Sequence, residues 1–193
     1  MGEKSEQKRQ MILTTARHIF AQKGYKDVTM KDIVEACGIS RGGLYLYFSS
    51  VREVFEAVLK EEEAETDDVF SRRLQEDATV ADVLMIFFKE QKKEILGRKE
   101  DLTVATYEYN FAHALSAEEN PQRRKFDDAV QALSQLLEAG MENGEFYEME
   151  SRAAAANIMY ALEGLRVLSR TIGISEERID DELFTLVSGI VPD

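Results

Sequence analysis

Hydrogen-bond donors gather around a pair of glycines near the start of the chain. The stretch CGISRGGLYLYFSS, residues 37–50, places Gly42 and Gly43 in a short predicted helix. Arg41 precedes the pair, and Tyr45 and Tyr47 follow it. A guanidinium and two phenol hydroxyls can donate to phosphates or base edges, and small residues let a helix approach such a partner closely. The glycines lower helix propensity by roughly 1 kcal/mol each, which favours a functional reason for them.

The residues that most often carry enzyme or metal chemistry are few and scattered. His18 and His113 lie far apart, and the chain has one cysteine, Cys37, which falls in an apolar helical stripe. We find no HExxH motif, glycine-rich phosphate loop or nucleophile motif. A single cysteine also excludes an intrachain disulfide, as suits a reducing compartment. We therefore expect no enzyme, no metal site and no cofactor.

Three helices, of which the second and third are short, must position the glycine pair. Helical periodicity and end signals predict them over residues 5–24, with Ser5 as the first cap, 29–38 and 41–47. Thr29 with Asp32 forms a capping box, and Ser40 caps the third helix. Gly38 permits the turn between the second and third helices, and Ile39 holds that turn to the core. The pattern predicts a helix-turn-helix; the alternative is an ordinary loop over the core.

Six more helices are expected after the helix-turn-helix. They are predicted over residues 50–76, 79–95, 102–115, 121–144, 152–173 and 176–191. Ser50 with Glu53 is a second predicted capping box, and Ser151 is predicted to cap the eighth helix. The helix over 102–115 is apolar nearly all round, so we expect it to be central. The fold class is therefore all-α, with about nine helices.

Charge separates the front of the chain from the rest. Residues 1–50 hold eight Lys or Arg and five Asp or Glu, a net charge of +3, whereas the remainder holds 16 against 32, a net charge of −16. This asymmetry indicates that the front meets a polyanion, although chance variation among solvated faces is the alternative. No apolar run approaches the roughly 18 residues of a membrane span, so we expect a cytoplasmic protein without membrane contact. The expected domains are 1–50 and 51–193.

The run over residues 8–59 resembles the N-terminal DNA-binding domain of the TetR (tetracycline repressor-like, TetR/AcrR) family of bacterial transcriptional regulators. The residues that carry the resemblance are Phe20, Gly24, Thr29, Ile33, Ala36, Gly38, Ser40, Gly43, Leu44, Tyr45 and Phe48. One position departs from the pattern, because Val51 stands where the family commonly has a lysine that contacts a phosphate.

The resemblance implies a homodimer that binds a palindromic operator in double-stranded DNA, usually as a repressor. It implies a C-terminal helical body that binds a small-molecule effector and dimerises. The implied DNA contacts are Thr29, Ser40, Arg41, Gly42, Tyr45 and Tyr47. Ser49, Ser50 and Arg52 are expected to replace the contact of the missing lysine.

The body supplies candidate contacts for an effector and for a second copy. Rings and thioethers predict an apolar or aromatic effector, with candidates Phe88, Tyr107, Tyr109, Phe111, His113, Met141 and Met159. The alternative is that these side chains are plain core. The expected dimer contacts are Ile158, Leu162, Leu165, Leu183, Val187 and Ile190. The alternative function is a helical protein-interaction adaptor without sequence-specific DNA binding.

Overall fold

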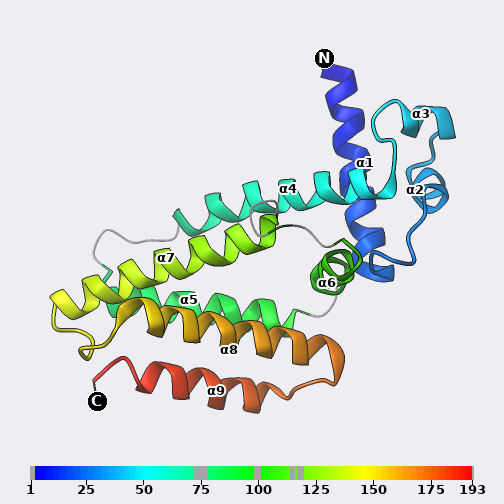
Figure 1. Cartoon of the computed structure of the whole chain (residues 1–193). Helices are drawn as coiled ribbons and strands as arrows, with labels where there is room; N and C mark the ends of the chain where they lie inside the picture. Colours follow the sequence, from blue (N-terminus) through cyan, green and yellow to red (C-terminus); the bar gives the residue numbers. More distant parts are fainter. Residues whose placement is uncertain (1–2, 72–77, 98–100, 114–115, 117–119, 193) are drawn as a thin grey trace. The chain divides into compact units, whose positions relative to one another are not determined.

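The computed structural model describes residues 3–71, 78–97, 101–113, 116 and 120–192, with side chains given as far as Glu62 in the first range. Within these residues the chain forms nine α-helices and no strand, which confirms the all-α fold (Figure 1). They are α1 (Glu3–Lys23), α2 (Met30–Cys37), α3 (Arg41–Tyr45), α4 (Val51–Ser71), α5 (Val80–Leu96), α6 (Thr103–Ala112), α7 (Pro121–Glu142), α8 (Ser151–Thr171) and α9 (Glu176–Ser188). The predicted helix ends at Glu76 and Leu115 lie outside the described residues. None of the nine helices is both long enough and apolar enough to cross a membrane.

The helices form two compact units. Unit 1 comprises Met1–Arg73 and Lys99–Ala114, and unit 2 comprises Leu74–Arg98 and Leu115–Asp193. Unit 1 therefore contains α1 to α4 and α6. This division differs from the boundary expected after residue 50, because α4 and α6 both pack on α1. The chain passes between the two units three times.

Side-chain caps fix the starts of α2 and α3. Thr29 Oγ1 accepts a hydrogen bond from the Asp32 N–H, and the Asp32 carboxylate accepts one from the Thr29 N–H, so the predicted capping box is confirmed. Ser40 Oγ accepts from the Gly43 N–H at 3.1 Å. Gly38 follows α2 with a φ of +63°, a left-handed conformation in which a Cβ atom would be strained. The caps and this glycine together give the tight turn of the helix-turn-helix.

Two other predicted caps differ in detail. Ser50 Oγ accepts from the Glu53 N–H at 3.2 Å, but the Glu53 carboxylate bonds to Ser49 and does not complete a box with Ser50. At α8 the cap is Glu150, whose carboxylate accepts a hydrogen bond from the Ala153 N–H in the first turn. Ser151 is instead the first residue of the helix and is buried.

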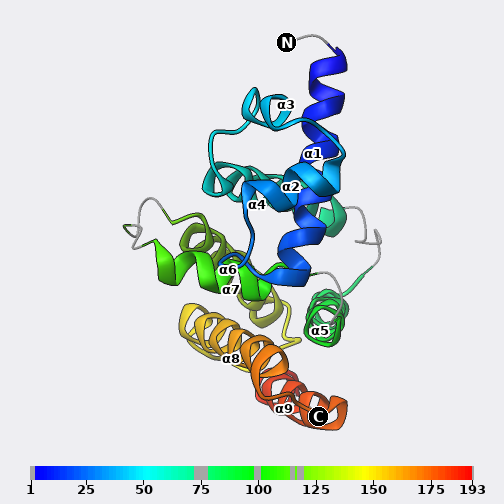
Figure 2. The same cartoon turned by 90° about the vertical axis from the view of Figure 1, so that its right-hand side faces the viewer.

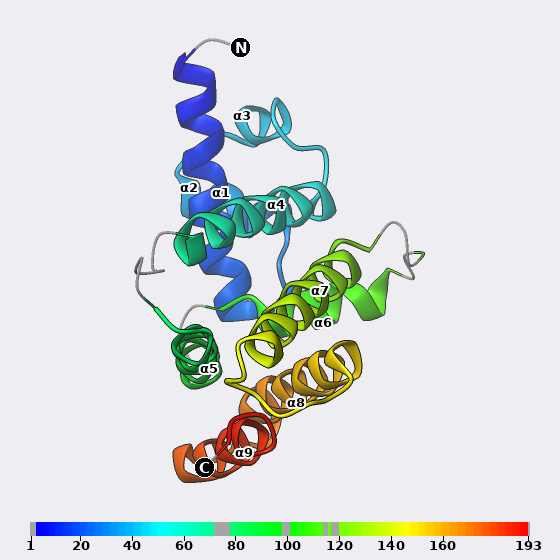
Figure 3. The ribbon, with the colours of Figure 1, turned by 90° about the vertical axis from the view of Figure 1, so that its left-hand side faces the viewer.

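The core of unit 1 lies where α1 meets its neighbours. Figure 2 shows α1 beside α2, and Figure 3 shows α4 crossing α1. Phe20 of α1 and Phe55 of α4 are fully buried, with ring centroids 4.7 Å apart in an edge-to-face arrangement. Leu44 and Phe48, within and just after α3, are also buried. These two side chains attach the short helix to the unit.

α6 is not the central helix that its apolar sequence predicts. Along it Ala105 and Tyr109 are buried, while Val104 is 45% exposed and Phe111 is 82% exposed. Within unit 1 the helix packs on α1, and Tyr109 also contacts Phe55 of α4. An apolar sequence therefore does not fix how many neighbours a helix has.

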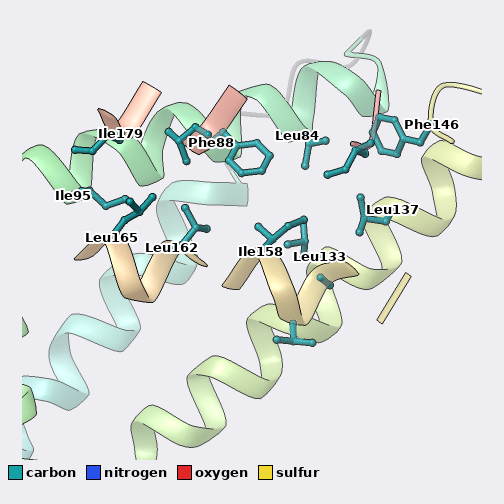
Figure 4. Close-up of a cluster of buried hydrophobic side chains, with 14 residues drawn as sticks. Leu84, Phe88, Ile95, Leu133, Leu137, Phe146, Ile158, Leu162, Leu165 and Ile179 are labelled. Atoms are coloured by element: carbon teal, nitrogen blue, oxygen red, sulfur yellow. The ribbon is translucent and has the colours of Figure 1, made fainter. Parts of the chain in front are cut away.

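A hydrocarbon core holds unit 2 together. Its buried side chains are Leu84, Phe88, Ile95, Val130, Leu133, Leu137, Phe146, Ala155, Ile158, Leu162, Leu165, Ile179, Leu183 and Ile190. Figure 4 shows side chains of α5 pointing toward Leu162 and Ile158 of α8. The Phe146 ring covers Gly140 of α7, where an added Cβ would come within 2.0 Å of the ring. Position 140 therefore has no room for a side chain.

Most of the residues predicted for the dimer interface belong to this core. Those at most 7% exposed are Ile158, Leu162, Leu165, Leu183 and Ile190, and Val187 packs partly buried against them. A side chain that one chain buries leaves almost no surface for a partner. The structure therefore places these side chains in the core of one chain, and the position of the dimer interface stays a prediction.

Candidate nucleic-acid interface

The outward side of α3 carries the charged and aromatic groups noted in the sequence. Leu44 is fully buried, whereas Arg41, Tyr45 and Leu46 are exposed. The Arg41 guanidinium lies over the Tyr45 ring, with Cζ 5.4 Å from the ring centroid. The ring attracts the cation and so holds Arg41 along the helix. α3 thus presents an oriented cation and a phenol hydroxyl on one side.

The glycine pair leaves the backbone of α3 open. No atom outside the neighbouring backbone lies within 4 Å of the point where a Gly42 Cβ would stand. At Gly43 that point lies 3.2 Å from Ser40 Oγ and 3.8 Å from Lys8 Nζ. Lys8 belongs to α1, and no local sequence pattern indicates that its ammonium lies beside α3. A partner can therefore approach Gly42 closely next to a cation.

α1 also supports the residues that follow α3. Ser5, predicted as a cap, lies inside α1 because the helix begins two residues earlier. Its hydroxyl donates to the Tyr47 hydroxyl oxygen at 3.4 Å, which leaves the Tyr47 proton available for another acceptor. The Arg9 guanidinium lies over the Phe48 ring, 5.7 Å from the centroid. The first contact orients the Tyr47 hydroxyl, and the second links Phe48 to α1.

The Thr29 side chain is already engaged in hydrogen bonds as the N-cap of α2. Its hydroxyl hydrogen-bonds to the Asp32 carboxylate, and Lys23 Nζ donates to the same group at 2.6 Å. The hydrogen bonds from Lys23 and then Thr29 hold the pKa of Asp32 well below its usual range. Thr29 therefore fixes the start of α2, and its contact with DNA stays a prediction.

The hydrogen-bond donors at the start of α4 already bond to carboxylates of the same helix. The Ser49 N–H and hydroxyl donate to Glu53 at 2.6 and 2.8 Å, and they lower the pKa of Glu53. Arg52 Nε donates to Glu56 at 2.7 Å. Exposed ion pairs contribute little to stability, so a phosphate can compete with Glu56 for the Arg52 guanidinium. Val51 is half-buried and offers no side-chain donor.

The segment that contains this interface matches a known family. Residues 12–58, from α1 into α4, match the family described as "Bacterial regulatory proteins, tetR family". A Bacillus subtilis protein described as "Uncharacterized HTH-type transcriptional regulator YfiR" is 29% identical over 183 residues, covering 92% of this chain and 86% of the relative. The chain belongs to the TetR family. It is a DNA-binding transcriptional regulator.

Two further proteins resemble this TetR-family regulator. The Corynebacterium glutamicum "HTH-type transcriptional repressor AcnR" is 37% identical over 70 residues, 36% of this chain and 37% of the relative. The crystal structure of a putative transcriptional regulator from Saccharomonospora viridis in complex with choline has a TM-score of 0.81 at 19% identity, covering 97% of this chain and 100% of that one. At that identity the likeness shows a shared fold alone.

Four of the effector contacts predicted for this TetR-family regulator lie in unit 1, on α6 or just after it. They are Tyr107, Tyr109, Phe111 and His113. Tyr109 is buried, with its ring centroid 4.7 Å from that of His113 and 5.1 Å from that of Tyr25. Its hydroxyl donates to Glu56 at 2.5 Å. Burial, and then the hydrogen bond to the Glu56 carboxylate, raise the pKa of Tyr109 to about 12. Tyr109 is therefore a core residue of unit 1.

Glu108, which sequence reasoning did not select, ties α6 to the end of α1. One carboxylate oxygen accepts from the N–H groups of Tyr25 and Lys26, at 2.7 and 3.0 Å. A second tie joins the Tyr25 hydroxyl to His113 Nε2 at 2.8 Å. These partners lie 82 to 88 positions apart in the chain, and no local pattern marks such pairs.

The other predicted effector contacts of the TetR-family regulator separate into exposed and packed residues. Phe111 is 82% exposed, with its ring centroid 6.2 Å from that of Tyr107. Phe88 is a core residue of unit 2, and Met141 and Met159 pack partly buried against the same core. The structure thus pairs Tyr109 with His113 and Tyr107 with Phe111. Phe111 is the ring most open to a ligand.

Proposed function

We propose that this TetR-family regulator is a repressor that binds a palindromic operator as a homodimer and leaves it when a small apolar or aromatic effector binds. The observation that carries the proposal is the exposed Arg41–Tyr45 pair beside the open backbone of Gly42. The net charge of +3 over residues 1–50 directs this face toward phosphates, while the acidic remainder is repelled. The Corynebacterium relative described as a repressor supports the direction of regulation. Since the target is DNA, we expect the protein to act in the bacterial cytoplasm.

In the proposed complex one side chain reads sequence and the others position the helix. The Arg41 guanidinium donates to a guanine edge in the major groove. The hydroxyls of Tyr45 and Tyr47 donate to phosphates. The remaining proposed backbone contacts are Thr29, Ser40, Gly42, Ser49, Ser50 and Arg52.

Selection of bound sequences from random duplex DNA, followed by binding measurements at several salt concentrations, tests this function. Arg41→Ala should weaken binding by about 1 to 3 kcal/mol and relax the preference at one position of each half-site. Tyr45→Phe should lower affinity on all sequences alike, because phosphate contacts carry no sequence information. Binding that is neither selective nor salt-dependent would instead indicate a helical adaptor.

A two-fold dimer matches a palindrome because the same symmetry axis relates the two subunits of the dimer and the two half-sites of the operator. Exposed apolar side chains of α8, of the residue that caps its C-terminal end and of α9 are the proposed contacts: Tyr160, Leu168, Ile172 and Phe184. Phe184→Glu should give monomers in light scattering and lose operator binding with α3 intact. Gln135→Glu, an equally charged change at an exposed position of α7, is the control and should stay dimeric. A stable Phe184→Glu dimer would move the interface elsewhere.

Phe111 is the proposed effector contact on α6, since its ring is exposed beside Tyr107. The choline complex of the Saccharomonospora viridis regulator shows that a protein of this fold holds a small organic ligand. Fluorescence anisotropy of labelled operator with a panel of apolar and aromatic compounds identifies those that release it. Phe111→Ala should weaken release and leave affinity without compound unchanged. If Phe111→Ala releases as the wild type does, the effector binds elsewhere.

A further inference from the structure

Leu46 is an exposed hydrocarbon side chain on a face that meets DNA. It directly follows α3, between the buried Leu44 and Phe48, yet it is 84% exposed. Single exposed leucines are common on protein surfaces and need no explanation by themselves. This one lies inside the segment that matches the TetR family and next to the exposed Tyr45. Its position therefore indicates that the Leu46 side chain has a contact partner in the major groove of the DNA.

The neighbouring glycine determines what Leu46 can reach. The Leu46 N–H bonds to the Gly42 carbonyl at 3.2 Å, so the two residues are one helical turn apart on the same side of α3. Side chains on a helix lean toward its N-terminus, which carries Leu46 over position 42. Gly42 has no side chain, and the space above it is open. The Leu46 side chain and the Cα atom of Gly42 together form a small apolar surface at this position.

The major groove offers few apolar groups to such a surface. Its base edges present donors and acceptors, and the one apolar group of the four common bases there is the 5-methyl group of thymine. A hydrocarbon side chain gains nothing from phosphates or from polar base edges. We infer that Leu46 contacts the 5-methyl group of a thymine in each operator half-site and so determines sequence preference at that position. The inference rests on the proposed binding of an operator through α3.

A double-substitution experiment isolates this contact. The probe is the duplex selected from random DNA, and in further copies each thymine in turn is replaced by deoxyuridine, which lacks only the 5-methyl group. For the wild type, replacement at one position per half-site should weaken binding roughly fourfold for each methyl group, the value of one buried carbon. For Leu46→Ala the same replacement should have no further effect. Selection with Leu46→Ala should also lose the thymine preference at that position.

Two controls make the result specific. Met85→Ala truncates a side chain of α5 that is 52% exposed and lies in unit 2, so it should keep the wild-type sensitivity to deoxyuridine. The melting temperature of Leu46→Ala should equal that of the wild type, because the removed atoms are already in solvent.

Other outcomes separate the inference from the proposed function. If no duplex is selectively bound by the wild type, the proposed function itself fails. If the wild type binds selectively but Leu46→Ala and deoxyuridine weaken binding independently at every thymine, the thymine contact is wrong and the function stands. A change of oligomeric state in Leu46→Ala would assign the leucine to a contact between copies and would also overturn the inference.

Discussion

α6 of unit 1 and α8 of unit 2 are attached to their neighbours by different chemistry. α8 buries four apolar side chains against other helices of unit 2, with Leu162 fully enclosed. α6 buries Ala105 and Tyr109 and is tied by the Glu108 carboxylate to backbone N–H groups at the end of α1. Hydrocarbon burial depends weakly on salt and pH, whereas carboxylate and phenol contacts depend on both. The comparison teaches that helices of similar apolar content can respond very differently to solution conditions.

The largest expected effect comes from the core of unit 2. Leu162→Ala removes a fully buried side chain, so it should lower the free energy of unfolding by about 2 to 5 kcal/mol. Urea unfolding measures the loss, which should change little between low and high salt. Leu46→Ala removes the same atoms from an exposed position and is the matched control, expected within about 0.5 kcal/mol of wild type. A strongly salt-dependent loss in Leu162→Ala would break the comparison.

An intermediate effect is expected at the polar tie of α6. Glu108→Ala leaves the N–H groups of Tyr25 and Lys26 without their acceptor and should cost about 1 to 2 kcal/mol. Operator affinity should fall as well, because these groups lie between α1 and α2. Glu145→Ala is the control, since Glu145 accepts from two N–H groups at the start of α5 in unit 2. Equal loss of operator affinity in both variants would contradict a role specific to unit 1.

The smallest effect concerns one hydroxyl. Tyr109→Phe removes the donor to Glu56 and should cost about 0.5 to 1.5 kcal/mol near neutral pH. The pKa of Tyr109 is raised to about 12, above the value of about 10 for an unfolded tyrosine. The contribution of the hydroxyl is therefore complete below pH ~10 and is lost as the pH rises toward ~12.

Unfolding in urea at increasing alkaline pH checks this sign. The stability difference between wild type and Tyr109→Phe should shrink as the pH rises above ~10. Leu162→Ala removes no titrating group, so its stability difference from the wild type should not change over this pH range. A difference that stays constant with pH would mean that the hydroxyl of Tyr109 does not couple to folding.

Local signals carry most of the fold. Thr29, Ser40 and Thr79 start helices where the sequence predicts, because a cap needs only a side chain and the N–H groups two or three residues ahead. The turn at Gly38 and the inward Leu44 follow from the same short range. The helix-turn-helix could therefore be read from consecutive residues.

Residues that depend on distant partners could not be read in this way. Tyr109 and Phe111 are two positions apart and both aromatic. Tyr109 is nevertheless enclosed by Tyr25, just after α1, and Phe55 of α4, whereas Phe111 is exposed. Leu183 and Phe184 likewise divide between core and surface. Periodicity finds an apolar stripe but does not say whether the same chain or a second copy covers it.

Unit 1 consists of two separate segments of the chain, and this limits how hybrids of such regulators can be built. Residues 99–114 return to the unit after the chain has already entered unit 2, and they bring α6 with Glu108. A hybrid that joins the front of one regulator to the rest of another after Arg73 would pair the Tyr25 and Lys26 N–H groups with a foreign sixth helix. Exchanging sensing parts between regulators therefore requires that α6 be grafted together with the front that it fits.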